Sequence, residues 1–556
     1  MSHPGSADAD GARRIEILSA TWERIQITLR SRPVDGMPLD PVAIHLLGAD
    51  SVMGRTLVAP ARAWTDGDVI VARFNVMQGP RQAPLDPGRW ALVAIDDDGR
   101  TTVPILSVAM ETAEDLTRAL GDFPLARGRY TVRPTLAADG AVGLDVTMGP
   151  PQPLPAVDVT DDPDRGESFA RGQVIRVIQP FRRLRPWTFR LLFRLFRAAS
   201  RRNGRRILFT SDSRAELGGN IKIVYDRMVE RGLDREYELL TLFKESITVR
   251  RGFRDRLRLP WVLARADTIV IDDYQPVIAQ LDDSDARIVQ LWHAWGAFKT
   301  VGYSRVGKPG GLSPFSKVHK NYALAIVSSA SEVAFYAEAF GIPESRVIPT
   351  GIPRMDQFWD PARAAASREA TLAAYPAARG RTVYLFAPTF RGNGARSAWY
   401  DMSLLDYPAL FALCEARDAV CIIRMHPFVR TPLDIPMAYA DRIIDGSTSP
   451  IDINDVLFAT DLLITDYSSV VFEFSTMDRP MLFFADDLDE YVASRDFYVR
   501  YEDFVPGRIV RTFADLLDAI RREDYQVERL AAFRAEHLDH FDGQATDRVI
   551  DLLVAR

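Results

Sequence analysis

The chain has 556 residues, of which 47% are hydrophobic and 26% are charged. This length predicts more than one domain, and the composition is that of a globular protein and excludes an intrinsically disordered chain. The two cysteines are too few for a disulfide framework, and no run of about 18 apolar residues predicts a membrane-spanning helix. The first residues lack the apolar segment of a secretion signal, so we expect a cytoplasmic protein.

Residues 1–150 are predicted to form a small all-β, sandwich-like domain, whose role the sequence does not indicate. Residues 22–31 alternate between apolar and polar side chains, as a half-buried strand does. Their apolar face consists of Ile25, Ile27 and Leu29. Further strands are predicted at 90–95, where the following turn and second apolar run indicate a hairpin, and at 129–136 and 142–147.

An acidic, proline-rich stretch at 151–170 is predicted to be a linker, and an arginine-rich segment at 171–205 follows it. Between Arg171 and Arg206 there are twelve arginines and no acidic residue. Four of them have the spacing of one helical stripe, after Trp187 and among leucines and phenylalanines: Arg190, Arg194, Arg197 and Arg201. This pattern predicts a helix that binds an anionic membrane surface. One alternative is a helix packed on the protein itself. Nucleic acid is a third possibility, but no recognition motif supports it.

From residue 206 onward, short β-rich runs alternate with helical patterns. The first series of runs lies at 206–211, 237–242, 267–272, 287–292 and 322–328. The second series lies at 382–387, 419–425, 461–465 and 480–484. Two series of βα units predict two doubly wound, parallel-sheet domains in tandem, which we place at 206–360 and 361–556.

Open parallel sheets bind ligands at the carboxyl ends of their strands, and this rule selects polar residues from both predicted domains. The residues that follow a predicted strand are His293, Arg391, His426, Asp466, Ser468 and Ser469. Such residues, contributed by two domains, predict a donor and acceptor site in a cleft between them.

The segment 461–474 is the sharpest local signal. An apolar strand breaks at Asp466, and an apolar helix starts after Ser468 and Ser469, where free N–H groups favour a phosphate. Glu473 shares the face of Ser469, so it can reach a ribose hydroxyl beside such a phosphate. The alternative is that the two serines only cap the helix.

The two histidines and a lysine-containing loop remain open on the residues alone. His293 lies between Trp292 and Trp295, which predicts a water-poor site for an imidazole that titrates near neutral pH. A histidine at a strand end is, however, more often structural than catalytic, and the same alternative applies to His426. The lysines that follow His293 predict a site for acceptor phosphates or a solvated surface: Lys299, Lys308, Lys317 and Lys320.

Eight stretches, in order, resemble the CDP-glycerol:poly(glycerophosphate) glycerophosphotransferase family, the polymerases and primases of teichoic-acid-type polymers. They are LWHAWGAFKTVGYS (291–304), HKNYALAIVSS (319–329), PTGIPRMDQF (349–358), FAPTFRGN (386–393), RMHPF (424–428), INDVLFATDLLITDYSSVVFEF (453–474), RPMLFFADDLDEY (479–491) and RDFYVRYEDFVPGRIV (495–510). Together they cover roughly residues 205–520.

The resemblance implies a GT-B pair of Rossmann-type domains, attached peripherally to the inner face of the cell membrane. It implies that the hydroxyl end of a teichoic acid or capsule polymer attacks the β-phosphate of a CDP-polyol and releases CMP. His293 would be the general base, and His426 would stabilise charge on the phosphate. The donor would be held by Arg391, Asp466, Ser468, Ser469, Glu473 and Arg495. No cofactor, metal or nucleic acid is expected.

Glycerol phosphate is the polyol that the resemblance favours, and CDP-ribitol is an alternative donor for the same reaction. Two departures from the family pattern, Ala294 in place of a glycine and Glu473 in place of an aspartate, bear on which polyol fits. A GT-B glycosyltransferase that uses a sugar nucleotide is the other enzymatic alternative. The non-enzymatic alternative is a membrane-tethered binding module, in which both histidines are dispensable.

Overall fold

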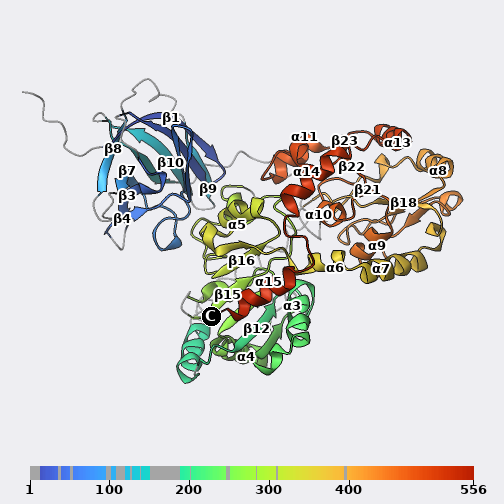
Figure 1. Cartoon of the computed structure of the whole chain (residues 1–556), viewed down its shortest axis with the longest axis horizontal. Coiled ribbons are helices and arrows are strands. Elements are labelled where there is room, and N and C mark those ends of the chain that lie inside the picture. Colours follow the sequence, from blue (N-terminus) through green and yellow to red (C-terminus); the bar gives the residue numbers. More distant parts are fainter. Residues whose placement is uncertain are drawn as a thin grey trace, which may run out of the picture.

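The structure, a computed structural model, shows a β domain followed by two α/β units (Figure 1). It describes residues 13–34, 39–50, 54–95, 102–107, 119–125, 128–137, 140–150, 188–200, 202–245, 251–282, 285–308, 311–392 and 397–555. The predicted linker at 151–170 lies outside these residues, as do Trp187 and Arg201. No helix in the described ranges is long and apolar enough to cross a membrane.

The N-terminal domain is a largely antiparallel sheet whose described strands enclose one core, which includes Ile27, Trp90 and Leu144. Its strands are β1 (Arg13–Glu23), β2 (Gln26–Pro33), β3 (Ile44–Asp50), β4 (Gly54–Val58), β5 (Arg62–Asp66), β6 (Val69–Asn75), β7 (Gly88–Ile95), β8 (Thr102–Ser107), β9 (Gly121–Leu125), β10 (Gly128–Leu136) and β11 (Val142–Gly149). The antiparallel pairing of β7 with β8 confirms the predicted hairpin.

The prediction of one strand over residues 22–31 is wrong, because a turn divides it. Strand β1 ends at Glu23, which pairs with Gln26 at the start of β2. Arg24 between them has a φ of 54°, and its guanidinium forms an ion pair of 2.6 Å with Glu338, far along the chain. Period-two alternation continues across the turn, so the sequence pattern alone did not reveal it.

The first α/β unit contains a parallel sheet in the order β13-β12-β14-β15-β16-β17. Its strands are β12 (Arg206–Ser211), β13 (Glu238–Phe243), β14 (Thr268–Ile271), β15 (Arg287–Gln290), β16 (Leu324–Val327) and β17 (Val347–Pro349). Its helices are α3 (Gly219–Glu230), α4 (Phe253–Arg265) and α5 (Val333–Phe340). Helices on both faces explain why strands such as β14 are continuously apolar and buried.

The second α/β unit has a parallel sheet in the order β20-β19-β18-β21-β22-β23, which is the strand order of a Rossmann domain. Its strands are β18 (Thr382–Phe386), β19 (Ala419–Ile423), β20 (Ile443–Asp445), β21 (Leu462–Thr465), β22 (Met481–Phe484) and β23 (Arg508–Val510). The helices from residue 356 onward are α6 (Asp356–Trp359), α7 (Pro361–Ala374), α8 (Tyr407–Ala416), α9 (Ile453–Ala459), α10 (Val470–Ser475), α11 (Leu488–Arg495), α12 (Tyr501–Phe504), α13 (Phe513–Arg522), α14 (Glu528–His537) and α15 (Ala545–Val554).

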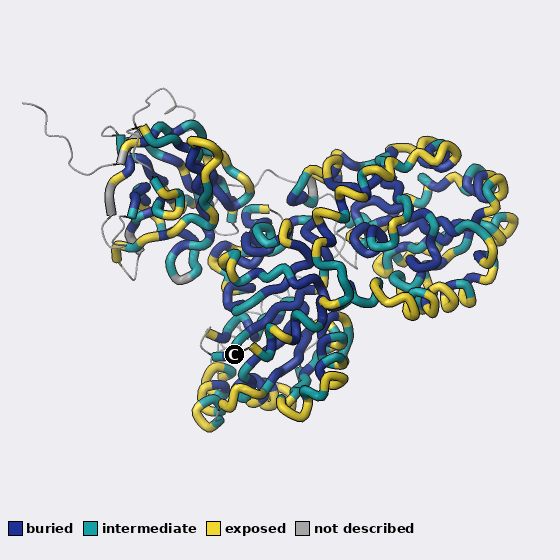
Figure 2. Tube along the Cα trace, viewed as in Figure 1, coloured by how far each residue is buried: buried dark blue, intermediate teal, exposed yellow. Residues whose placement is uncertain are grey.

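Helix ends follow sequence signals. The side chain of Asp360 caps α7 by accepting from the Ala362 N–H, and Pro361 occupies the first turn, where its missing donor costs nothing. Thr512 caps α13 in the same way. Helix α5 stops at Gly341, whose φ of 64° ends the helix in the left-handed conformation. Figure 2 shows the result, buried strands inside each unit and exposed residues on the outer helices.

The last helix does not stay with the second sheet. Helix α15 packs on α3 of the first unit, where it lies across the first sheet in Figure 1. Arg227 pairs with Asp547 at 2.8 Å, and Arg231 pairs with Asp551 at 2.9 Å. The chain therefore returns to the first unit at its end, which the proposed division at residue 361 does not anticipate.

The β domain contacts the first α/β unit through buried polar groups. Lys320 is only 4% exposed, and its ammonium donates to the carbonyl oxygens of Met77, at 3.2 Å, and Gln82. The prediction that Lys320 binds acceptor phosphate is corrected here, because its donors are directed at the backbone of the β domain. Burial lowers the pKa of this lysine to about 8.

Residues 188–199 form a helix that packs on the first unit, with Phe193 buried among residues of α4. Arg190 and Arg194 are exposed, as the predicted stripe requires. Arg197 is not part of that stripe, because its guanidinium donates to the carbonyl oxygens of Ala264, at 2.8 Å, and Asp285, at 2.5 Å. The packed-helix alternative therefore holds for one face of this helix.

At Gly296 the backbone of the first unit packs tightly against the second unit. Gly296 has a φ of +76°, and a Cβ placed on it would lie 1.9 Å from the Phe472 ring of α10. Just before it in the chain, Trp292 packs in the core of the first unit and Trp295 in the core of the second. The segment 291–298 therefore joins both cores, with His293 between the two tryptophans.

Replacing Gly296 by alanine is expected to cost about 2–4 kcal/mol, since strain at positive φ adds to overpacking against Phe472. Gly380→Ala is the matched control, because Gly380 has a φ of +75° and open space around it. Thermal unfolding of both variants measures the difference. Equal shifts in Tm for the two would contradict a tight junction at Gly296.

Candidate active site

The two parallel sheets each reverse strand order at one point, where doubly wound folds bind ligands. In the second sheet this point lies between β18 and β21. Arg391 follows β18 and Asp466 follows β21, and their side chains form an ion pair of 2.9 Å across the gap. The strand-end rule therefore brings these two predicted residues together.

Asp466 is buried and holds Arg391 in place. Its carboxylate is 1% exposed and accepts from the backbone N–H groups of Thr389, at 2.7 Å, and Tyr467, at 2.6 Å, as well as from Arg391. Because the carboxylate is buried and already receives these three donors, its role is to fix the loop and the guanidinium. The expectation that Asp466 itself contacts a donor is corrected accordingly.

Arg391 is held rigidly. It forms a two-point ion pair with Asp487, at 2.6 and 2.9 Å, and its guanidinium lies over the rings of Tyr467 and Tyr491. Those rings stack on each other at 3.7 Å. Two carboxylates already balance the charge of Arg391. Its contribution to ligand binding is therefore a fixed shape and hydrogen bonds more than net charge.

A pocket of about 1020 Å³ lies between the two units at this point. The first unit contributes Lys299, Thr300, Val301 and Arg305, and the second contributes Arg391, Gly392, Trp399, Tyr400, Asp401, Leu404, Asp486, Asp487, Glu490, Tyr491 and Arg495. Three predicted residues thus line one pocket: Lys299, Arg391 and Arg495. Its volume is at the upper end of the range of small-molecule sites.

Besides Arg391, three cations line this pocket: Lys299, Arg305 and Arg495. Among the ion pairs of the described residues, neither Lys299 nor Arg495 has a carboxylate partner. Arg495 donates to the carbonyl of Gly392 at 2.6 Å, and Arg305 donates to the carbonyl of Arg495 at 2.7 Å. These backbone contacts hold the guanidinium groups of Arg305 and Arg495 in place. This wall suits a phosphate group.

Lys299 is the titratable member of this wall. Its ammonium donates to the Tyr491 hydroxyl at 2.8 Å, and burial, with the neighbouring Arg495 and Arg391, lowers its pKa to about 8. Below that pH the lysine is charged and favours an anion. Above it, binding must first protonate the amine.

Affinity for CMP is therefore expected to fall by up to about tenfold per pH unit as the pH rises from 8 to 9.5, because the nucleotide phosphate is already fully ionised there. Calorimetric titration across this range measures the slope. Lys299→Arg, which keeps its charge, is expected to flatten it. If the affinity of the parent protein for CMP does not change with pH, Lys299 does not contact the phosphate.

His426 follows β19 and is fixed in one tautomer. Its Nδ1 accepts from the Phe428 N–H at 3.1 Å, so in the neutral ring the proton is on Nε2. The rings of Phe390 and Phe428 pack against it at 4.7 and 4.6 Å. Burial and the charge of Lys299 lower its pKa. His426 thus presents an N–H donor near the cationic wall.

His293 follows β15 and is fixed in the opposite tautomer. Its Nδ1 lies 3.3 Å from the carbonyl oxygen of Asp272, which can only accept, so Nδ1 carries the proton and Nε2 is a free base. The carboxylate of Asp273 lies 3.8 Å from the same nitrogen. The side chain is 51% exposed, yet the surrounding walls desolvate the ring and lower its pKa.

Glu473 is connected to the surroundings of His293 through Arg354. It is 4% exposed and pairs with Arg354, which lies close enough to His293 to lower the pKa of that histidine. Burial raises the pKa of Glu473. Its Oε2 and the Arg354 Nε are buried without a hydrogen-bond partner. The pair joins the first unit to α10 and leaves one buried carboxylate oxygen without a protein partner.

The two serines are less specific. The Ser468 hydroxyl accepts from the Val470 N–H at 3.3 Å, which is the capping alternative, and Ser469 makes no side-chain cap bond. Helix α10 is only six residues long. Lys308 is exposed and lies 3.6 Å from Asp496, and Lys317 is exposed. The structure does not gather these two lysines with Lys299, and their acceptor role stays a prediction.

Sequence reasoning missed four residues that shape the site: Asp272, Arg354, Asp487 and Tyr491. Asp272 follows β14 directly, so the strand-end rule could have found it. It is buried beside Arg214, at 2.9 Å, and burial raises its pKa to about 7. Asp487 lies three residues after β22, so the same rule could have found it, whereas nothing local distinguishes Arg354 and Tyr491. No group of histidine, cysteine, aspartate or glutamate in the described ranges could hold a metal ion.

The geometry is that of a two-unit α/β enzyme with its site between the units. A profile of the CDP-Glycerol:Poly(glycerophosphate) glycerophosphotransferase family matches residues 191–555. The chain is 44% identical over 373 residues to the teichoic acid ribitol-phosphate polymerase TarK of Staphylococcus aureus. This match covers 67% of this chain and 72% of that protein. The chain therefore belongs to this family.

The teichoic acid ribitol-phosphate polymerase TarL of the same organism is 40% identical over 423 residues, 76% of this chain and 74% of that protein. A solved structure of the wall teichoic acid polymerase TagF matches with a TM-score of 0.53 and 22% identity, over 70% of this chain and 97% of that chain. The match to TagF, at this identity, shows a likeness of fold. The resemblance found in the sequence is confirmed.

Proposed function

We propose that the chain transfers ribitol phosphate from CDP-ribitol to the hydroxyl end of a teichoic-acid-type polymer and releases CMP. The expectation of glycerol phosphate is not confirmed, because both relatives named above are ribitol-phosphate polymerases. The observation that carries the proposal is the pair of histidines, one from each unit, held in opposite tautomers. In this proposal the two parallel-sheet units are a GT-B pair, with the acceptor on the first and the donor on the second.

The chemistry follows from the free nitrogen positions. The Nε2 of His293 accepts the proton of the acceptor hydroxyl while that oxygen attacks the β-phosphorus of the donor. The bond from this phosphorus to the CMP oxygen breaks, and CMP leaves with the electron pair. The Nε2–H of His426, with Lys299 and Arg495, stabilises negative charge on the phosphate oxygens. His293 then returns its proton to solvent. No resident metal or cofactor enters this scheme.

Purified protein, a short polyol-phosphate acceptor and separate CDP-ribitol, CDP-glycerol and UDP-glucose reactions test the proposal. We expect CMP release and a product mass that grows by one ribitol phosphate unit with CDP-ribitol, and much slower turnover with CDP-glycerol. Preferred transfer from CDP-glycerol would restore the glycerol assignment. Sugar transfer from UDP-glucose would replace the proposed reaction by glycosyl transfer.

Attachment to an anionic membrane surface forms part of the proposal, and two adjacent helices support it. On the helix at 188–199, Arg190, Leu191, Arg194 and Leu195 are exposed. On α4, Leu257 and Trp261 are 44% and 43% exposed, and Arg254 and Arg258 on the same helix are also exposed. Apolar side chains flanked by arginines are what a helix in the headgroup layer requires.

Replacing Arg254, Arg258 and Trp261 together by Gln, Gln and Ser is expected to weaken binding to vesicles with anionic lipid by about tenfold or more, at about 1 kcal/mol for each arginine near the surface. Co-sedimentation measures this, with neutral vesicles for comparison. Arg368→Gln on α7 is the control for a loss of charge elsewhere. Unchanged sedimentation of the triple variant would refute the membrane face on α4.

A further inference from the structure

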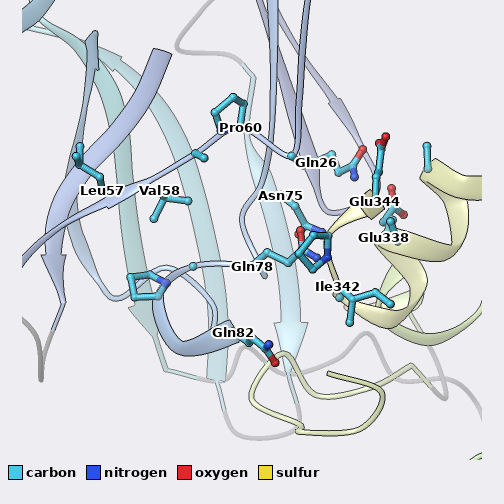
Figure 3. Close-up of a pocket in the computed structure, with 18 residues that line it drawn as sticks. Gln26, Leu57, Val58, Pro60, Asn75, Gln78, Gln82, Glu338, Ile342 and Glu344 are labelled. Carbon is cyan, nitrogen blue, oxygen red and sulfur yellow. The ribbon is translucent and has the colours of Figure 1, made fainter. Parts of the chain in front are cut away.

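A second cavity lies between the β domain and the first α/β unit, apart from the proposed transfer site. Its volume is about 350 Å³, within the range of small-molecule sites. Figure 3 shows it, with Gln26, Asn75 and Gln78 of the β domain facing Glu338 and Ile342 of the α/β unit. Neither domain forms this pocket by itself.

The walls of this pocket combine carboxamides with apolar groups. The carboxamides are Gln26, Asn75, Gln78 and Gln82, and the apolar groups include Leu57, Pro60 and Ile342. No lysine, arginine or histidine occurs among the described residues that line it, and two carboxylates do, Glu338 and Glu344. The described lining therefore offers an anion no cationic side chain to bind. Amides that donate and accept, beside C–H surfaces, match a chain or ring that carries many hydroxyl groups.

Asn75 has a donor with no protein partner. The side chain is 4% exposed, and its Oδ1 accepts from the Met77 N–H at 3.0 Å. Because a backbone N–H can only donate, this contact fixes the orientation of the amide, and Nδ2 is the remaining group. That Nδ2 is buried without a hydrogen-bond partner. Such a buried donor costs about 1–3 kcal/mol unless a ligand oxygen accepts from it.

The pocket is held in shape by contacts that the two domains share. Arg24 neutralises Glu338 through a two-point ion pair of 2.6 and 3.2 Å. Lys320 donates to the carbonyls of Met77 and Gln82, at the two ends of the loop that forms one wall. The walls are therefore preorganised, which lowers the entropy cost of binding.

We propose that this joint pocket binds a neutral, hydroxyl-rich unit of the growing polymer, an alditol or a sugar ring, outside the transfer site. The assignment to the polymer rests on the proposed function, whereas the preference for a neutral polyhydroxyl ligand rests on the pocket itself. Bound there, an earlier unit of the chain would keep the acceptor on the enzyme between transfers and so lengthen the product.

A short series of contacts connects the joint pocket to the transfer pocket. Arg24, which pairs with Glu338, lies 5.1 Å from the ring centre of Tyr498. The Tyr498 hydroxyl accepts from the Val301 N–H at 3.4 Å, and Val301 lines the transfer pocket. The two pockets are therefore linked by contacting side chains of the first unit.

Saturation-transfer NMR on the full-length protein tests the ligand class, with ribitol, maltose and inorganic phosphate as probes. Ala334→Tyr fills the pocket from α5, and Gln78→Leu removes one amide from the opposite wall. We expect both variants to lower the signal of ribitol or maltose by about fivefold or more. Ala366→Tyr, on the exposed face of α7, is the matched control and is expected to retain the parent signal.

The probes separate the possible sources of the ligand. A signal from ribitol assigns a backbone unit of the polymer, and a signal from maltose assigns a sugar substituent. Both retain the proposal. Competition by inorganic phosphate, or equal signals from the parent and both pocket variants, would overturn it. Gln78→Leu changes a half-buried side chain and keeps the test valid if Ala334→Tyr does not fold.

Product length tests the assignment to the polymer. With excess donor, both pocket variants are expected to make products several-fold shorter than the parent, at an unchanged rate of the first transfer to a short acceptor. Products of parental length from variants that no longer bind the probes would refute this assignment. If the parent transfers nothing, the proposed function fails, and the NMR result still decides whether the pocket binds polyhydroxyl ligands.

Discussion

His293→Ala is expected to lower kcat/KM for polymer extension by about 10²–10⁴-fold, the usual contribution of a positioned general base. The reason is geometric. The Asp272 carbonyl holds the proton of the ring on Nδ1, which leaves Nε2 as the only basic atom directed away from the backbone. Initial rates of CMP release, with donor and acceptor each varied, measure the loss.

His45→Ala is the matched control, because the His45 ring also contacts a backbone carbonyl through Nδ1, at 3.1 Å from Ala43, but lies in the β domain. It is expected to retain the parental rate. CMP release that survives in His293→Ala at the parental rate would remove this residue from the reaction. It would also favour a binding module over an enzyme.

The pH dependence of kcat/KM is a second test of the role of His293. Burial lowers the pKa of His293 from the ordinary value of 6.5. The neutral, basic form therefore dominates above that lowered value, and activity is expected to fall only as the pH drops through it. The acidic limb of kcat/KM should thus lie below pH 6.5. A limb above 7 would point to a different base or to a strong carboxylate partner.

His426→Ala is expected to act differently, because Nδ1 already accepts from the Phe428 N–H and only the Nε2 proton is available. Loss of one charge-stabilising donor costs about 10²–10³-fold in kcat and changes the KM for the acceptor little. His426→Gln, which retains an N–H donor, should recover part of the rate. An equal loss in both variants would indicate proton transfer by His426.

Much of the α/β framework could be predicted because buried parallel strands are continuous apolar runs. All nine β-rich runs after residue 205 correspond to strands. The sequence analysis missed β17, β20 and β23, each three residues long, because so short a run carries no periodicity. The strand-end rule then located Arg391, Asp466 and both histidines without any contact being known.

What could not be predicted depends on tertiary contacts. Arg24 adopts a positive φ in the two-residue turn between β1 and β2, and its guanidinium pairs with Glu338, a contact that the local sequence cannot show. Lys320 looked like a phosphate ligand, since sequence spacing cannot show that the carbonyls of Met77 and Gln82 receive its protons. The return of α15 to the first unit likewise depends on Asp547 meeting Arg227.

The Arg354–Glu473 pair carries the second large prediction. Removing one partner of a buried ion pair costs about 3–5 kcal/mol, and Arg354→Met leaves Glu473 in that state. The Arg354 side chain is 25% exposed, which places the expected loss near the lower end. Because the pair joins the two α/β units, the midpoint of thermal unfolding is the direct measurement.

The pH dependence of this loss has a definite sign. Burial already raises the pKa of Glu473, and without Arg354 its charged form is disfavoured further. At low pH the carboxyl is neutral and the penalty shrinks, so Arg354→Met should be closest to the parent near pH 5 and furthest from it near pH 8. A destabilisation that does not change with pH would mean that lost packing, and not an unpaired charge, is the cause.

The double variant Arg354→Met/Glu473→Met separates stability from function. It removes both charges, so most of the lost stability should return, with a coupling of about 0.5–3 kcal/mol in the double-mutant cycle. If Glu473 also accepts from the donor ribose through Oε2, this stable variant will bind CMP about tenfold more weakly than the parent. Parental affinity would confine Glu473 to joining the two units, and the ribose contact would have to come from another residue of the cleft.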